Sequence, residues 1–198
     1  MLDSMSSGGS TTRERILAAA RRMLEETPGA TATMGQIAER AGVSRQALYL
    51  HFADRTSLFL EIVRTVDATE RTPERQRRVD EAPTAREALR EAIALQAYLK
   101  PKLQGLTAAM EALRRTDPAA GAAWKEREHA RLQRCEQVVR RLADEGDLRT
   151  EWGISSAAQC FWAVTSQRVW HDLVVDQGWS TEKYCSHLTH LLEAALLD

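Results

Sequence analysis

The stretch "AGVSRQALYLHF", Ala41 to Phe52, is the most informative part of this chain. After Gly42 it leaves room for barely two turns of helix, because an α-helix needs 3.6 residues per turn. That short segment nevertheless carries a serine, an arginine, a glutamine, a tyrosine and a histidine. Two short helices joined by a tight turn that contains glycine, the second bearing outward polar groups, are typical of a helix-turn-helix.

The polar residues of this segment suit the contacts that a recognition helix makes in the major groove of DNA. The N-terminal residues of such a helix face base edges, where arginine pairs with guanine and glutamine with adenine. Arg45 and Gln46 are therefore the candidates for base contacts. Tyr49 and His51 lie further along and are placed to donate to phosphates, and Ser44 is expected to cap the helix and to reach a phosphate.

The residues on either side predict the neighbouring helices. A first helix is expected to begin near Thr12 and to end before Pro28-Gly29, a helix stop signal. The second is expected to be capped by Thr33 and the fourth by Asp54.

The remainder is rich in Ala, Leu, Arg, Glu and Gln, with almost no strand-like alternation, which predicts an all-α protein. The polar segment Glu70–Pro83 is interpreted either as a linker or as the solvent-facing end of the fourth helix. Further helices are predicted at Thr84–Lys100, Pro101–Thr116, Pro118–Glu145, Ile154–Asp176 and Thr181–Leu197.

From Thr11 to Val66, the arrangement "TTRERILAAARRMLEE…TATMGQIAERAGVSRQALYLHFADRTSLFLEIV" resembles the DNA-binding domain of the TetR family of transcriptional regulators. The chain departs from that family at Pro28-Gly29-Ala30, where glycine and then an aromatic residue are usual. A lysine is usual at the start of the fourth helix, and Arg55 keeps its charge. The expected DNA-binding set is Thr33, Ser44, Arg45, Gln46, Tyr49, His51 and Arg55.

The resemblance implies an all-α fold with a three-helix DNA-binding domain and a larger helical domain that binds an effector and dimerises. The expected divisions are a disordered tail over 1–11, a helix-turn-helix domain over 12–66 and the larger domain over 67–198. The last two predicted helices are apolar over most of their circumference, as helices buried on two sides are. One side would face the protomer's own core and the other a second copy, although two central core helices would show the same pattern.

A pocket for the effector is expected between the long helices. The candidate lining residues are Trp124 and Trp162, with weaker support for Gln96, Leu99, Leu103 and Met110. Such pockets are mostly apolar with a few polar groups, so a small apolar or aromatic effector is expected.

Several classes of function find no support in the sequence. The formal net charge is −1, which argues against a broadly basic coat for nucleic acid, and the three cysteines form no CxxC pair. There is no catalytic motif, phosphate loop or metal-binding cluster, so no enzyme activity, cofactor or metal is expected. No apolar run is long enough for a membrane span and no secretory signal is evident, so a cytoplasmic location is expected.

The preferred interpretation is a ligand-responsive transcriptional regulator, a repressor as is usual in that family. It would bind a palindromic operator as a homodimer and be released by its effector. The alternative is a helical adaptor or scaffold that retains a helix-turn-helix without regulating DNA. The outward set of Arg45, Gln46, Tyr49 and His51 favours the first, because a scaffold has no physical need for it.

Overall fold

The structure is a computed structural model that describes residues 10–26 and 32–198. The described part is helical, with no β-structure in it beyond one isolated bridge between Leu148 and Leu197. The all-α prediction is therefore confirmed. The predicted helix stop at Pro28-Gly29 and most of the predicted disordered tail lie outside the described residues.

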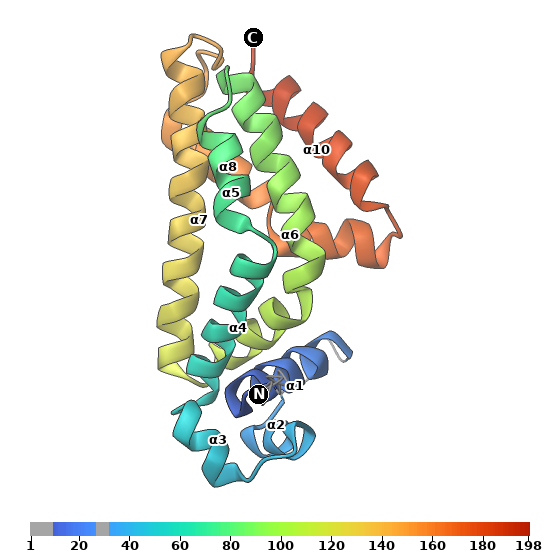
Figure 1. Ribbon diagram of the computed structural model, residues 1–198. Coiled ribbons are helices and arrows are strands. Elements are labelled where there is room, and N and C mark those ends of the chain that lie inside the picture. Colours follow the sequence, from blue (N-terminus) through green and yellow to red (C-terminus); the bar gives the residue numbers. More distant parts are fainter. Residues whose placement is uncertain (1–9, 27–31) are drawn as a thin grey trace, which may run out of the picture.

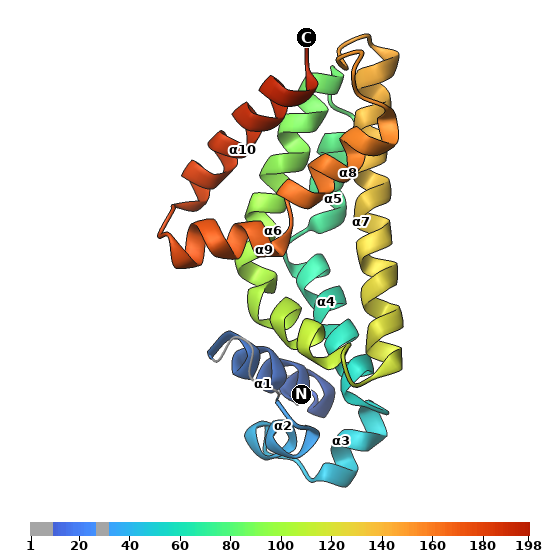
Figure 2. The ribbon, with the colours of Figure 1, turned by 180° about the vertical axis from the view of Figure 1, so that it is seen from behind.

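The helices form an elongated bundle with the N-terminal three at one end and the C-terminus at the other (Figures 1 and 2). In chain order they are α1 (Thr12–Glu26), α2 (Met34–Ala41), α3 (Arg45–His51), α4 (Arg55–Thr69), α5 (Thr72–Asp80), α6 (Ala85–Leu113), α7 (Pro118–Asp144), α8 (Ile154–Val164), α9 (Gln167–Trp170), the π-helix η1 (His171–Asp176) and α10 (Thr181–Leu196).

The three predicted capping residues begin the helices assigned to them. The Thr33 hydroxyl accepts a hydrogen bond from the Gln36 backbone amide at 3.3 Å, and the Ser44 hydroxyl accepts one from the Ala47 amide at 3.0 Å. Asp54 accepts one from the Ser57 amide at 2.6 Å. Each bond satisfies a backbone donor that the first helical turn leaves without a partner.

The turn between α2 and α3 depends on Gly42 and on a contact from α1. Gly42 has a φ of 65°, in the left-handed region that favours glycine. The Arg15 guanidinium donates to the carbonyl oxygens of Ala41 at 2.7 Å and of Gly42 at 2.9 Å. A positive group at the C-terminal end of α2 also complements the helix dipole. These hydrogen bonds tie α1 to the turn between the two short helices.

Three predictions about the long helices need correction or completion. The prediction of two separate helices, Thr84–Lys100 and Pro101–Thr116, was wrong, because α6 runs through Pro101. Proline removes one backbone donor, but buried residues on both sides, including Leu95 and Leu103, hold the helix together by packing. The prediction of a single helix from Ile154 to Asp176 was also wrong, since α8 ends at Val164 and Ser166 caps the next helix, α9. The polar Glu70–Pro83 segment contains a helix of its own, α5.

The buried apolar side chains form two clusters that divide the molecule along its length. The first joins α1 to α4 with the C-terminal half of α6, through residues such as Leu103, Leu106 and Met110. The second joins α5, the N-terminal half of α6 and the helices from α7 to α10. The predicted boundary at residue 66 falls inside α4, so α4 and α6 connect the N-terminal helices to the larger domain.

Candidate functional site

The outer face of α3 carries the residues predicted to read base edges. Arg45 and Gln46 are exposed in its first turn, and Tyr49 is 47% exposed one turn later. Leu48 is fully buried in the first core cluster and anchors the opposite face. Since residues four apart share a helix face, Arg45 lies above Tyr49 along one line. The helix thus presents polar groups outward from an apolar anchor.

Leu50 is a candidate contact that the sequence reasoning missed. It is 82% exposed and lies four residues after Gln46, on the same helix face. An exposed leucine of this kind contributes nothing to the core, but an apolar side chain in the major groove contacts the methyl group of thymine. The sequence signal for this contact is the four-residue spacing between Gln46 and Leu50.

The hydroxyl groups of the capping residues Thr33 and Ser44 differ in whether their hydrogen is free to donate a further hydrogen bond. Thr33 donates its hydroxyl hydrogen to the Gln36 side-chain oxygen at 2.8 Å, so this donor is already used. Ser44 only accepts, from the Ala47 amide, which leaves its hydroxyl hydrogen available for a phosphate. Ser44 is the better placed of the two for a contact outside the chain.

His51 ends α3, and Arg55 begins α4 four residues later. Arg55 is the first residue of α4 and is half-buried, with one guanidinium nitrogen 3.5 Å from the Ala32 carbonyl oxygen. That contact joins α4 to the residue before the α2 cap and uses one of five donors. His51 is exposed as the last residue of α3.

Contacts from α1 and from the start of α7 hold α4 in place. Arg13 of α1 lies 5.2 Å from the centre of the Phe52 ring and 2.8 Å from the Glu61 carboxylate. Hydrogen bonding to Arg13 lowers the pKa of Glu61. Thr56, which is buried, donates to Asp117 at 3.1 Å, and Asp117 also caps α7. This hydrogen bond joins the start of α7 to the start of α4.

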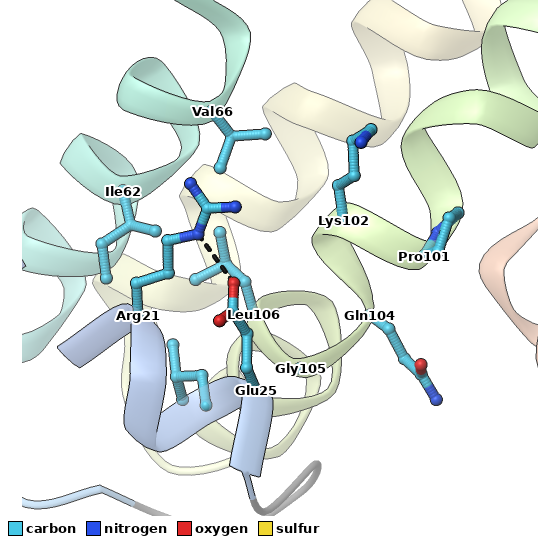
Figure 3. A pocket seen from close by; sticks show the side chains of 10 residues that line it. Arg21, Glu25, Ile62, Val66, Pro101, Lys102, Gln104, Gly105 and Leu106 are labelled. Carbon is cyan, nitrogen blue, oxygen red and sulfur yellow. Dashed lines mark hydrogen bonds and ion pairs between the residues drawn. The ribbon is translucent and has the colours of Figure 1, made fainter. Parts of the chain in front are cut away.

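A shallow pocket of about 110 Å³ marks where α1 meets α4 and α6 (Figure 3). Arg21 and Glu25 of α1 form an ion pair of 2.7 Å beside it, and Ile62 and Val66 of α4 border it. Gly105 of α6 also lines the pocket, in close contact with the backbone of Leu24 of α1.

A second cavity of about 110 Å³ lies within the larger domain, between α4, α5, α6, α7 and α9. Four of the six predicted ligand-binding residues line it: Gln96, Leu99, Leu103 and Trp124. Met110 lines an adjoining smaller hollow together with Leu103 and Trp124. Trp162 does not line this cavity, because its ring packs against the Arg131 guanidinium, whose carbon lies 4.9 Å from the ring centre.

The polar side of this cavity contains residues that the sequence reasoning did not single out. Lys100 lines it and is only 7% exposed, and its ammonium has no hydrogen bond or ion pair among the described residues. Burial lowers the pKa of Lys100 to about 7, and the charge of Arg131 acts in the same direction. Arg131 itself is satisfied by Glu128 at 3.1 Å and by the Trp162 carbonyl at 2.9 Å. The Thr72 hydroxyl is buried there without a partner in the described chain.

Two features of the remaining surface bear on other functions. His171, Asp172 and Asp176 place possible metal-binding atoms within 4.8 Å of one another on the surface of η1. Asp172 is already paired with Arg168 at 2.8 Å, and His171 lies 3.5 Å from Asp176, as expected of surface ion pairs. Within the described residues, no helix has the length and apolar character needed to cross a membrane.

Residues 16–62 match the family described as "Bacterial regulatory proteins, tetR family". The same region is 43% identical over 51 residues to the HTH-type transcriptional regulator AcrR of Shigella flexneri. The aligned stretch covers 26% of this chain and 24% of that protein, so the chain matches about a quarter of its relative's length.

Solved structures extend the similarity over nearly the whole chain. NalD, described as the secondary repressor of the MexAB-OprM multidrug efflux pump in Pseudomonas aeruginosa, is 25% identical with a TM-score of 0.72, covering 94% of this chain and 96% of NalD. SmeT, described as the repressor of the Stenotrophomonas maltophilia pump SmeDEF, is 25% identical with a TM-score of 0.69, covering 96% and 92%. Both the small N-terminal helices and the larger domain have counterparts in these proteins.

Proposed function

Because this chain belongs to the TetR family of bacterial regulatory proteins, we propose that it is a transcriptional repressor released from its operator by a small molecule. The observation that carries the proposal is the outer face of α3, where Arg45, Gln46, Tyr49 and Leu50 are exposed around a helix anchored by buried Leu48. The repressor role is supported by the descriptions of NalD and SmeT.

We further propose that the protein acts as a homodimer on a palindromic operator. A single α3 has fewer than two turns, so one copy offers few contacts, and two-fold symmetry lets a pair read two half-sites. Leu188 and Leu192 of α10 are buried in the protomer's own core, which accounts for one side of that helix. Leu191 is 50% exposed on the other side and is the candidate centre of the dimer contact.

Release by an effector would act through α4. The cavity is bordered by Asp67 of α4 and Thr72 of α5, while the N-terminal end of α4 follows α3 directly. A ligand that fills the space against Leu99 and Trp124 would change the angle of α4 and with it the spacing of the two recognition helices. Such a ligand must bind the arrangement that cannot fit DNA more tightly than the one that can.

The test is an electrophoretic mobility shift with the purified full chain and the DNA that flanks its own gene. A shift that survives excess unrelated DNA, and that footprints to an inverted repeat, is the expected result. The control is the Arg45→Ala and Gln46→Ala double variant, whose fold should be unchanged because both side chains are exposed. Equal binding to flanking and unrelated DNA would refute operator recognition and favour a helical scaffold.

A further inference from the structure

We propose that the effector carries a single carboxylate bound by Lys100, and that its enclosed part is about the size of one aromatic ring. This inference rests on the proposed function, because it names the class of molecule that the cavity of the larger domain accepts. It is carried by the charge balance inside the cavity, by two polar groups without partners, and by the volume available.

The ion pairs around the cavity leave the buried Lys100 ammonium without a counterion among the described residues. Arg131 and Glu128 neutralise each other at 3.1 Å, both on α7. Lys100 on α6 is as deeply buried as Arg131, yet no carboxylate among the described residues pairs with it. Asp67, Arg127 and Arg134 also border the cavity. Burial lowers the pKa of Arg127 and the charge of Asp67 opposes that shift, while Arg134 is exposed, so water screens it. An unpaired buried charge is costly unless a ligand completes it.

The hydrogen-bonding groups fit a carboxylate better than a neutral or cationic group. An ammonium offers three donors and no acceptor, and the buried Thr72 hydroxyl offers one more. Gln96 adds an amide to the same wall. Two carboxylate oxygens accept several hydrogen bonds, and bonds to charged groups are the stronger ones. The single charge of the Lys100 ammonium matches the one charge of a carboxylate, whereas a dianionic phosphate carries a second negative charge.

The apolar wall and the volume limit the rest of the molecule. Leu99, Leu103 and Trp124 form the apolar side of a cavity of about 110 Å³. An engineered apolar cavity of ~150 Å³ in another protein holds one benzene molecule, so the enclosed part here is of single-ring size or smaller. Drug-sized ligands occupy roughly 300–1,000 Å³ and would require the helices to separate.

The experiment compares acids with their neutral amides on the DNA-free protein. Benzoate is compared with benzamide and phenylacetate with phenylacetamide, each titrated by calorimetry. Tryptophan fluorescence gives a second measurement, since Trp124 lines the cavity. Each acid should bind at least about tenfold more tightly than its amide, as expected for a charge-assisted hydrogen bond. Lys100→Met should abolish that preference, and Lys125→Met, which changes an exposed lysine on α7, should retain it.

Folding of the variants is checked by thermal unfolding. Lys100→Met should melt at a higher temperature than the parent without ligand, because the parent buries a cation that only a ligand pairs. Lys100→Gln serves as a second variant if the Lys100→Met protein does not fold. Equal binding of acid and amide, a preference retained in both Lys100 variants, or no binding of any acid at millimolar concentration would overturn the proposal.

The outcomes separate this inference from the proposed function. Operator binding is measured without any acid. If the protein does not bind the operator, the proposed repressor function is refuted, and the acid-binding result is unaffected. Conversely, an acid that binds the free protein but leaves the operator complex intact would confirm the carboxylate site and refute its role as the effector site.

Discussion

A β-carbon placed on Gly105 of α6 would lie 2.0 Å from the carbonyl oxygen of Leu24 of α1. No real side-chain atom tolerates that distance, so the end of α1 rests directly on the backbone of α6. The requirement for glycine here comes from close packing and not from an unusual backbone angle, since only Gly42, Gly146 and Gly178 among the described glycines have positive φ. This contact joins the DNA-reading end to the larger domain.

Replacing Gly105 with alanine should push α1 away from α6 and destabilise the protein by about 1–3 kcal/mol, the range for overpacked sites. Urea denaturation of the parent and the variant measures it. Gly121→Ala in α7 is the matched control, because its β-carbon would meet its nearest neighbour at an ordinary 3.5 Å. The control should gain about 0.5–1 kcal/mol from better helix propensity. Equal stability of both variants would show that α1 does not rest on Gly105.

Arg45→Ala should lower specific operator affinity by about 1–3 kcal/mol and relax the preference at one base pair, if that residue pairs with a guanine. Binding to the operator and to single-base variants, each measured at fixed salt, tests this. A uniform loss on all sequences would assign Arg45 to a phosphate instead.

Leu50→Ala should weaken operator binding without affecting folding, because Leu50 is 82% exposed. The reason is loss of an apolar contact with a thymine methyl group. Replacing thymidines of the half-site singly with deoxyuridine removes the methyl from the other side of that contact. At one position the deoxyuridine and Leu50→Ala should each cost the same binding free energy. Combining the two changes should cost no more than either change alone. Additive costs at every position would place Leu50 away from thymine.

Two neighbouring leucines of α10 should respond oppositely to glutamate. Leu192 is 1% exposed within the core, so Leu192→Glu should unfold the protomer by burying an unpaired charge. Leu191→Glu should leave the protomer folded and shift the dimer toward monomer. Circular dichroism and analytical ultracentrifugation report the two results. A fully folded dimer of Leu191→Glu would place the subunit contact elsewhere.

The affinity for benzoate should fall as the pH rises through 7. The lowered pKa of Lys100, about 7 without ligand, means that the charged form that binds a carboxylate is present below pH 7 and lost above it. From pH 6 to pH 8 the charged fraction falls roughly tenfold, and the affinity should follow. The charged and titratable groups that act on Lys100 are Arg131, Glu128, Arg127 and Cys135. Calorimetry across this range measures the effect, and Lys100→Met should show a flat profile.

The parts that the sequence predicted well depend on signals within a few residues. Thr33, Ser44 and Asp54 are followed by the backbone amides that they cap, so the short N-terminal helices could be placed from local chemistry alone. Gly105 and Lys100 could not be assigned roles, because their environments are created by residues of other helices. Pro101 is the opposite case, since a strong local signal for a helix end was overridden by packing on both sides.

The mixed first core has a practical meaning for anyone who builds chimeric regulators from this chain. Leu103, Leu106 and Met110 belong to the larger domain in sequence but to the DNA-reading end in packing. A graft cut at residue 66 would end inside α4 and would leave behind, in the parent chain, part of the apolar support of the transplanted helices. The natural unit of exchange comprises α1 to α4 together with the stretch of α6 beyond Pro101, two segments that are discontinuous in the gene.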